Sequence, residues 1–144
     1  MNILKVLTEK RELGNVGENA VADLLKKNGY KITKKNYVAN GHEVDIIAEN
    51  KEYICFVEVK TRTLGEKSSV EPRPASAVTP EKQRSVISAA RFYLGGFFDP
   101  RMARFDVAEV YVKDGKVSDI CYMENAFNYN TATADGYRYK RSKK

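Results

Sequence analysis

The sequence predicts an α/β domain in which a mixed central sheet is flanked by helices, with the elements in the order α-β-β-β-α-β-β. Two helical apolar periods and several short β-branched and aromatic runs bounded by turn residues predict this class. The chain has 144 residues, 42% of them hydrophobic and 31% charged, which suits one globular domain.

The first element is a predicted helix from about Glu9 to Asn28. Asn28-Gly29 is a typical helix end. Apolar residues recur at helical spacing and are expected to form one face of this helix: Leu13, Val16, Ala20 and Leu24.

Three strands are predicted next, over Tyr30–Ala39, Glu43–Glu49 and Tyr53–Thr61. The first is followed by Asn40-Gly41, a strong turn signal. The third is apolar on both faces at its centre, so we expect it to be buried inside the sheet.

A long loop and a second helix follow. Residues 63–80 hold three of the four prolines, and the sequence predicts a flexible loop that orders on DNA or on a partner subunit. The second helix is predicted from Pro80 to Leu94, with Thr79 as its N-cap.

The last predicted elements are a hairpin and a tail. Strands Arg104–Lys113 and Val117–Met123 are expected around the Asp114-Gly115 turn, which completes a domain of residues 1–124. Residues 125–144 read as a disordered basic tail. Its last eight residues carry five positive charges, and +6 minus 5 leaves +1 for the rest, so bulk charge is a weak argument for nucleic-acid binding.

The composition excludes several classes of protein. Cys55 and Cys121 are the only cysteines and His42 is the only histidine, which argues against a disulfide scaffold, structural zinc and histidine-based nucleophile activation. We expect no signal peptide, and no apolar run approaches the roughly 20 residues of a membrane helix. We therefore expect a cytoplasmic protein.

The most informative feature is a pair of carboxylates on the second and third strands. If Lys51-Glu52 forms a two-residue loop, Asp45 lies opposite Glu58, whereas an odd loop length would break this register. Their Cβ atoms would be about 5 Å apart. At an effective dielectric constant of about 20, the repulsion between two such charges is roughly 3 kcal/mol.

A bound cation would turn this repulsion into attraction. Oxygen ligands without histidine favour Mg²⁺ or Mn²⁺. Lys60 lies two residues after Glu58 and shares its face of the strand, so it suits a phosphate oxygen or an attacking water. The alternative is an exposed sheet face on which Lys60 is the ion-pair partner of both carboxylates.

Five segments carry a family resemblance. They are Gly14-Asn15-Val16-Gly17-Glu18, Glu43-Val44-Asp45-Ile46-Ile47-Ala48, Phe56-Val57-Glu58-Val59-Lys60-Thr61-Arg62, Val78 with Lys82-Gln83, and Arg104-Phe105-Asp106-Val107. From about Gly14 to Val110 the chain resembles the YraN-like bacterial family of the PD-(D/E)XK nuclease superfamily. The resemblance implies a restriction-endonuclease-like fold, similar to that of Holliday-junction resolvases.

The resemblance also implies residue roles. Asp45 and Glu58 would ligate the metal, with help from the Val59 carbonyl, and Lys60 would position water or stabilise developing charge. Glu18 would complete the acidic cluster, with a solvated helix residue as the alternative. Nucleic-acid contacts are implied for four further residues, whose alternatives are a polar first helical turn or surface ion pairs: Arg62, Lys82, Gln83 and Arg104.

Two departures from the family pattern concern the strand that carries Asp45. No proline precedes Asp45, and His42 stands where the family usually has glycine. A proton carrier and a plain surface histidine are the two interpretations of His42.

The expected function is that of a Mg²⁺-dependent or Mn²⁺-dependent endonuclease that hydrolyses DNA phosphodiester bonds, with branched or damaged DNA as one substrate class. The alternatives are a nuclease-fold module that binds DNA or protein without cutting, and a metal-free scaffold. DNA and a second copy of the chain are the expected partners.

Overall fold

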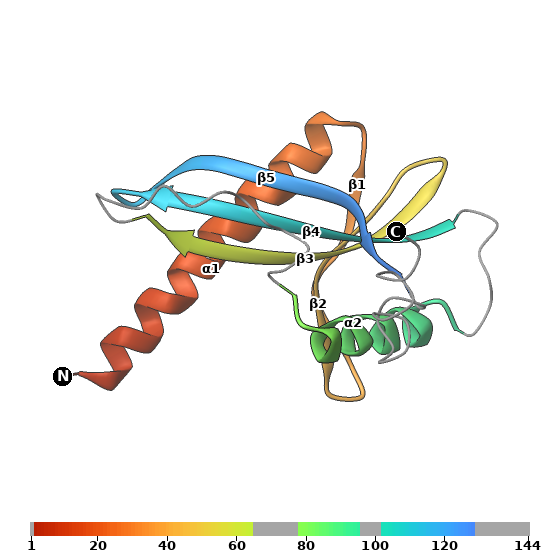
Figure 1. Cartoon of the computed structure of the whole chain (residues 1–144), viewed down its shortest axis with the longest axis horizontal. Coiled ribbons are helices and arrows are strands. Elements are labelled where there is room, and N and C mark those ends of the chain that lie inside the picture. The colour runs from red at the N-terminus through yellow and green to blue at the C-terminus, as the bar shows by residue number, and fades with distance from the viewer. Residues whose placement is uncertain (1, 65–77, 96–101, 129–144) are drawn as a thin grey trace, which may run out of the picture.

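The computed structural model describes residues 2–64, 78–95 and 102–128 (Figure 1). Its elements are α1 (Ile3–Lys27), β1 (Lys31–Ala39), β2 (His42–Glu49), β3 (Tyr53–Thr63), α2 (Pro80–Tyr93), β4 (Met102–Lys113) and β5 (Lys116–Phe127). This order confirms the predicted α/β class and the predicted sequence of elements.

The five strands form one mixed sheet in the order β1-β2-β3-β4-β5. Neighbouring strands are antiparallel except β3 and β4, which are parallel. A parallel pair needs a crossover connection, and α2 lies in it. Each helix belongs to a different core cluster, so α1 and α2 cover different faces of the sheet (Figure 1).

The β2–β3 hairpin has the predicted register. The Asn50 amide donates to the Tyr53 carbonyl at 3.0 Å, which leaves Lys51 and Glu52 as the two loop residues. Asn50 Oδ1 accepts hydrogen bonds from the amides of Glu52 and Tyr53 at 2.8 and 2.7 Å and so holds this turn. The pairing of Ile46 with Val57 follows the same register.

The strand β3 is buried on both faces, as predicted. Cys55 and Val57 pack with α1, whereas Ile54 and Phe56 pack with α2. On the α2 side, an aromatic ladder crosses the strands: the Phe56 and Phe105 ring centroids are 5.5 Å apart, and those of Phe105 and Phe127 are 5.4 Å apart.

The helix α1 differs from its prediction in two ways. It begins at Ile3, where Asn2 is the N-cap, and its first turns extend past the strands with Ile3 and Leu4 exposed (Figure 1). Its buried face includes Gly17, Val21 and Leu25, one position after the predicted residues, and the predicted core residue Val16 is exposed. Because Gly17 has no side chain, α1 packs closely against β3 at this residue.

Three predicted boundaries also shift. β3 continues to Thr63, β5 continues past the predicted domain boundary at residue 124, and α2 ends at Tyr93. The extension of β5 has a physical cause, because Ala126 and Phe127 are 7% and 2% exposed in the core. Most of the predicted loop, residues 65–77, and the basic segment 137–144 lie outside the described residues.

Neither α1 nor α2, the two described helices, is both long and apolar enough to traverse a lipid bilayer.

Candidate functional site

Asp45 and Glu58 come together where β2 and β3 separate. Asp45 Oδ2 accepts a hydrogen bond from the Val59 amide at 2.8 Å, so a side chain satisfies the backbone of the neighbouring strand. Glu58, the residue before Val59, is 4% exposed, and its carboxyl interacts directly with that of Asp45. The predicted convergence of these two carboxylates is therefore present.

The environment of Glu58 disfavours its charged form. Burial raises the pKa of Glu58 to about 9, and the hydrogen bond and negative charge of Asp45 add to this effect, while Lys82 opposes it. At neutral pH the carboxyl pair therefore retains a proton. A divalent cation would replace that proton and allow both groups to ionise.

The first turn of α2 supplies the counter-charge at this site. Thr79 Oγ1 accepts a hydrogen bond from the Lys82 amide at 3.2 Å, as an N-cap does, and this fixes the start of the helix. Lys82 Nζ then lies 3.4 Å from Glu58 Oε2. Lys82 therefore contacts one of the two carboxylates, whereas the nucleic-acid contact implied for it stays a prediction.

Glu58 Oε2 is buried and has no hydrogen-bond partner among the described residues. Its 3.4 Å approach to Lys82 is an ion pair without hydrogen-bond geometry. Buried polar atoms are rarely left in this state, because an unmade hydrogen bond costs about 1–3 kcal/mol. A small cation at this oxygen would remove that cost.

The donor set fits Mg²⁺ or Mn²⁺. Carboxylate oxygens suit hard cations, and Mg²⁺ is commonly held by one or two carboxylates with water completing its shell. Among the described residues, no three His, Cys, Asp or Glu side chains are grouped around one point where an ion could bind. Asp45 and Glu58 are thus the two carboxylates available as a pair.

Glu18 lies at the edge of this site. Burial and the negative charge of Asp45 raise the pKa of Glu18, whereas Lys35 lowers it. The Asn36 amide, with its nitrogen toward the carboxylates, donates to Glu18 at 3.0 Å and to Glu43 at 3.2 Å. The charge of Asp45 therefore reaches Glu18, whose own hydrogen-bond partner is Asn36.

A close helix–strand contact sets the position of Glu18. A Cβ atom on Gly17 would lie 1.9 Å from Thr61 Oγ1, which no packed structure tolerates. The glycine allows α1 to lie against β3 beside Glu18. The sequence pattern singled out Gly17 but carried no sign of Thr61 as its neighbour.

Lys60 is exposed and makes no hydrogen bond or ion pair with another described residue. It follows Glu58 by two residues and so shares its face of β3. The alternative in which Lys60 neutralises the two carboxylates does not describe this structure, because Lys82 takes that place.

Two further residues with implied nucleic-acid contacts have partners within the protein, and the Arg62 side chain is 53% exposed. Arg62 Nε lies 3.0 Å from Glu109 Oε1, so the salt-bridge alternative describes Arg62. Gln83 is 8% exposed, and its Nε2 donates to the Val78 carbonyl at 3.0 Å. His42 is half-buried, with Nδ1 2.7 Å from Ser85 Oγ on α2.

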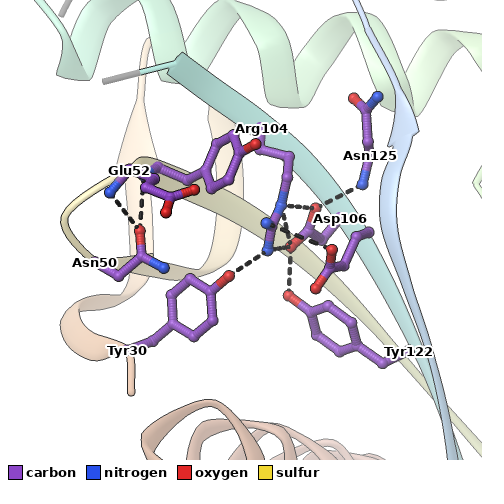
Figure 2. Close-up of polar contacts among 9 residues, drawn as sticks. Tyr30, Asn50, Glu52, Arg104, Asp106, Tyr122 and Asn125 are labelled. Atoms are coloured by element: carbon purple, nitrogen blue, oxygen red, sulfur yellow. Dashed lines mark hydrogen bonds and ion pairs between the residues drawn. The ribbon is translucent and has the colours of Figure 1, made fainter. Parts of the chain in front are cut away.

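Arg104 belongs to a second polar cluster, with Asp106, Tyr30 and Tyr122 (Figure 2). It is 7% exposed, and its Nε and NH2 lie 2.9 Å from the two oxygens of Asp106. Asp106 also accepts from the Tyr122 hydroxyl at 2.6 Å and the Asn125 amide at 2.9 Å. The predicted phosphate contact is therefore a buried ion pair.

Sequence reasoning missed this second cluster, although one signal was present. Arg104 and Asp106 are two residues apart, so on a strand they share a face and can pair. Tyr30 and Tyr122, whose hydroxyls point toward this pair in Figure 2, come from distant parts of the chain. No local pattern predicts their convergence.

The comparisons with known proteins agree on one family. Residues 17–110 match the model of "Uncharacterised protein family UPF0102". A UPF0102 protein of Chlorobium phaeobacteroides strain BS1 is 38% identical over 122 residues, 81% of this chain and 94% of its own length. Those of Caldicellulosiruptor saccharolyticus and Syntrophomonas wolfei are each 42% identical, over 82% and 81% of this chain and 98% of their own lengths. These matches confirm the YraN-like part of the resemblance, and the chain belongs to the UPF0102 family.

Proposed function

We propose that this protein is a Mg²⁺-dependent or Mn²⁺-dependent nuclease of the PD-(D/E)XK superfamily that hydrolyses DNA phosphodiester bonds. The observation that carries the proposal is the convergence of Asp45 and Glu58 on a buried point where Glu58 Oε2 has no hydrogen-bond partner. The order of helices and strands agrees with the restriction-endonuclease-like fold that this proposal includes.

Asp45 and Glu58 would hold the metal ion in this proposal, with the Val59 carbonyl as a further oxygen ligand. The Val59 amide orients the Asp45 carboxylate, and Lys82 limits the cost of ionising Glu58. When bound, the cation would polarise the phosphate and lower the pKa of a water molecule.

Lys60 would act on the substrate. Its ammonium is exposed and makes no ion pair with another described residue, so it is available to a phosphate oxygen or to the attacking water. Glu18, held by Asn36, would add negative charge at the edge of the site and help to attract the cation.

A module that binds DNA or protein without cutting is the second candidate. The ion pair between Lys82 and Glu58 favours it, because that contact already compensates part of the buried negative charge without a metal. Metal binding and cleavage separate the two candidates.

The test is a cleavage screen over single-stranded, flapped and four-way DNA with Mg²⁺ and Mn²⁺, together with calorimetry of Mn²⁺ binding. We expect Glu58→Gln to abolish both metal binding and cleavage, and Lys60→Ala to abolish cleavage while metal binding persists. Lys113→Ala, which removes another exposed strand lysine, is the matched control. Wild-type protein that binds no Mn²⁺ at millimolar concentration would contradict the proposal.

A further inference from the structure

A pocket of about 360 Å³ lies beside the second polar cluster, near the end of α1. Leu24 and Leu25 of α1 line it, and five polar residues complete its wall: Asn28, Tyr30, Arg104, Tyr122 and Glu124. Sites for small molecules occupy about 300–1,000 Å³, so this pocket suits a ligand of modest size.

The hydrogen-bonding capacity of Arg104 is only partly used. Its Nε and NH2 donate to Asp106, and NH2 also donates to the Tyr30 hydroxyl at 2.9 Å (Figure 2). Among the described residues NH1 has no hydrogen-bond partner; it forms an ion pair with Glu124, 3.6 Å from Oε2, and the Glu124 side chain is 65% exposed. A buried guanidinium thus presents a free donor to the pocket, beside an exposed carboxylate.

The hydroxyls of Tyr30 and Tyr122 also keep unused hydrogen-bonding capacity at the pocket. The Tyr30 hydroxyl accepts from Arg104, so its own hydrogen is free to donate. The Tyr122 hydroxyl donates to Asp106, which leaves only its lone pairs for a ligand. Their rings and the two leucines provide apolar walls, against which a flat ring can stack.

We infer that this pocket binds an unpaired guanine base. The Watson–Crick edge of guanine carries the O6 acceptor next to two donors, N1–H and N2–H. Arg104 NH1 is a donor for O6, and the two oxygens of the neighbouring Glu124 carboxylate accept from the two N–H groups.

The other bases match this pattern less well. Adenine and cytosine each offer the carboxylate one donor group rather than two. Thymine and uracil offer a single N–H between two carbonyl oxygens, one of which would face the Glu124 carboxylate. The carboxylate therefore discriminates among the bases, while Arg104 and the apolar walls contribute to binding any of them.

The guanine can come from a free mononucleotide or from an unpaired position in a strand. The inference does not depend on the proposed nuclease activity, because base binding here involves neither Asp45 nor Glu58. It is therefore tested in the presence of EDTA, where cleavage plays no part.

The experiment is calorimetric titration of the full chain with GMP, AMP, CMP and UMP, with inorganic phosphate as a control for the phosphate group. We expect GMP to bind most tightly and Glu124→Ala to weaken GMP binding by about tenfold or more, because it removes two charge-assisted hydrogen bonds. Asp119→Ala, which removes another exposed carboxylate of β5, is the matched control and should leave binding unchanged.

A second titration identifies the source of the base. A ten-residue oligothymidine containing one guanine should bind more tightly than GMP if a strand is the natural ligand, and less tightly if a mononucleotide is. The inference is overturned if GMP binds no better than CMP and UMP, if Glu124→Ala leaves GMP binding unchanged, or if phosphate alone competes fully with GMP.

Discussion

Two of the clusters in which the described residues bury charge, one around Asp106 and one around Glu58, differ in how completely that charge is compensated. Asp106 is fully buried and accepts hydrogen bonds from Arg104, the Tyr122 hydroxyl and a backbone amide. Glu58 is nearly as buried, yet its Oε2 has no hydrogen-bond partner.

The difference indicates what each cluster does for the protein. A fully hydrogen-bonded buried pair fixes the packing of the strands around it, and removing one partner is costly. An unsatisfied carboxylate lowers stability, and such costs are usually found where a ligand binds. We therefore expect substitutions in the two clusters to have opposite effects on stability.

The largest effect is expected for Asp106→Ala. This change leaves the buried Arg104 guanidinium without its counter-charge, so the free energy of unfolding should fall by about 3–5 kcal/mol. Urea denaturation measures it, with Asp119→Ala on the exposed part of β5 as the control. A loss below about 1 kcal/mol would show that the Arg104–Asp106 pair is not a stabilising centre.

Gly17→Ala should have the next largest effect, because the added Cβ would lie 1.9 Å from Thr61 Oγ1 and either the Thr61 side chain or α1 must shift. Overpacking of this kind typically costs about 1–3 kcal/mol. Gly14→Ala is a matched control, since its Cβ would meet nothing within 4 Å on the same helix. That control should stabilise the protein by about 0.5–1 kcal/mol through helix propensity. Equal effects of the two changes would contradict the close contact.

The pH dependence of stability distinguishes the carboxylate pair from the Arg104 cluster. The pKa of Glu58 is raised from 4.5 to about 9, so the native state keeps a proton that the unfolded state releases. This contribution to the free energy of unfolding is fully present below pH 4.5 and is lost as pH rises toward 9. Thermal unfolding of the metal-free protein across this range measures it.

Glu58→Gln should remove this part of the pH dependence and raise stability at pH 8. Millimolar Mn²⁺ at the same pH should stabilise the wild type and leave the variant unchanged, since only bound ligand shifts the unfolding equilibrium. A variant whose stability falls with pH as steeply as that of the wild type would assign the titration to another group.

The smallest effects are expected for the two lysines near Glu58. Lys82→Ala removes the ion pair and should lower the free energy of unfolding by about 0.5–1 kcal/mol, while Lys60→Ala should stay within about 0.5 kcal/mol. Denaturation of both variants at pH 7 tests this ranking. A larger loss for Lys60→Ala would make Lys60 a structural residue and remove its proposed role toward substrate.

The parts of the site that could be predicted are those with local causes. The pairing of Asp45 with Glu58 depends on a loop of two residues and on strand alternation, and both are readable from the sequence. The N-cap Thr79 is equally local. These features needed no knowledge of how distant segments pack.

The parts that could not be predicted depend on long-range packing. Lys82, rather than Lys60, compensates the negative charge of Glu58, because the crossover connection places the first turn of α2 beside Glu58. The hydrogen bond of Arg104 to Tyr30 joins residues 74 positions apart in the sequence. The first turns of α1 were not predicted, because they are exposed and so have no apolar face with helical spacing in the sequence.

The parallel pairing of β3 with β4 has a consequence for the order of folding. The β2–β3 hairpin is a local structure and can form early, whereas the parallel pair must wait for the whole crossover to close. Asp45 and Glu58 would then face each other before α2 brings Lys82 to them. An early intermediate would carry uncompensated negative charge, so we expect mildly acidic conditions, which protonate these carboxyls, to accelerate formation of the hairpin.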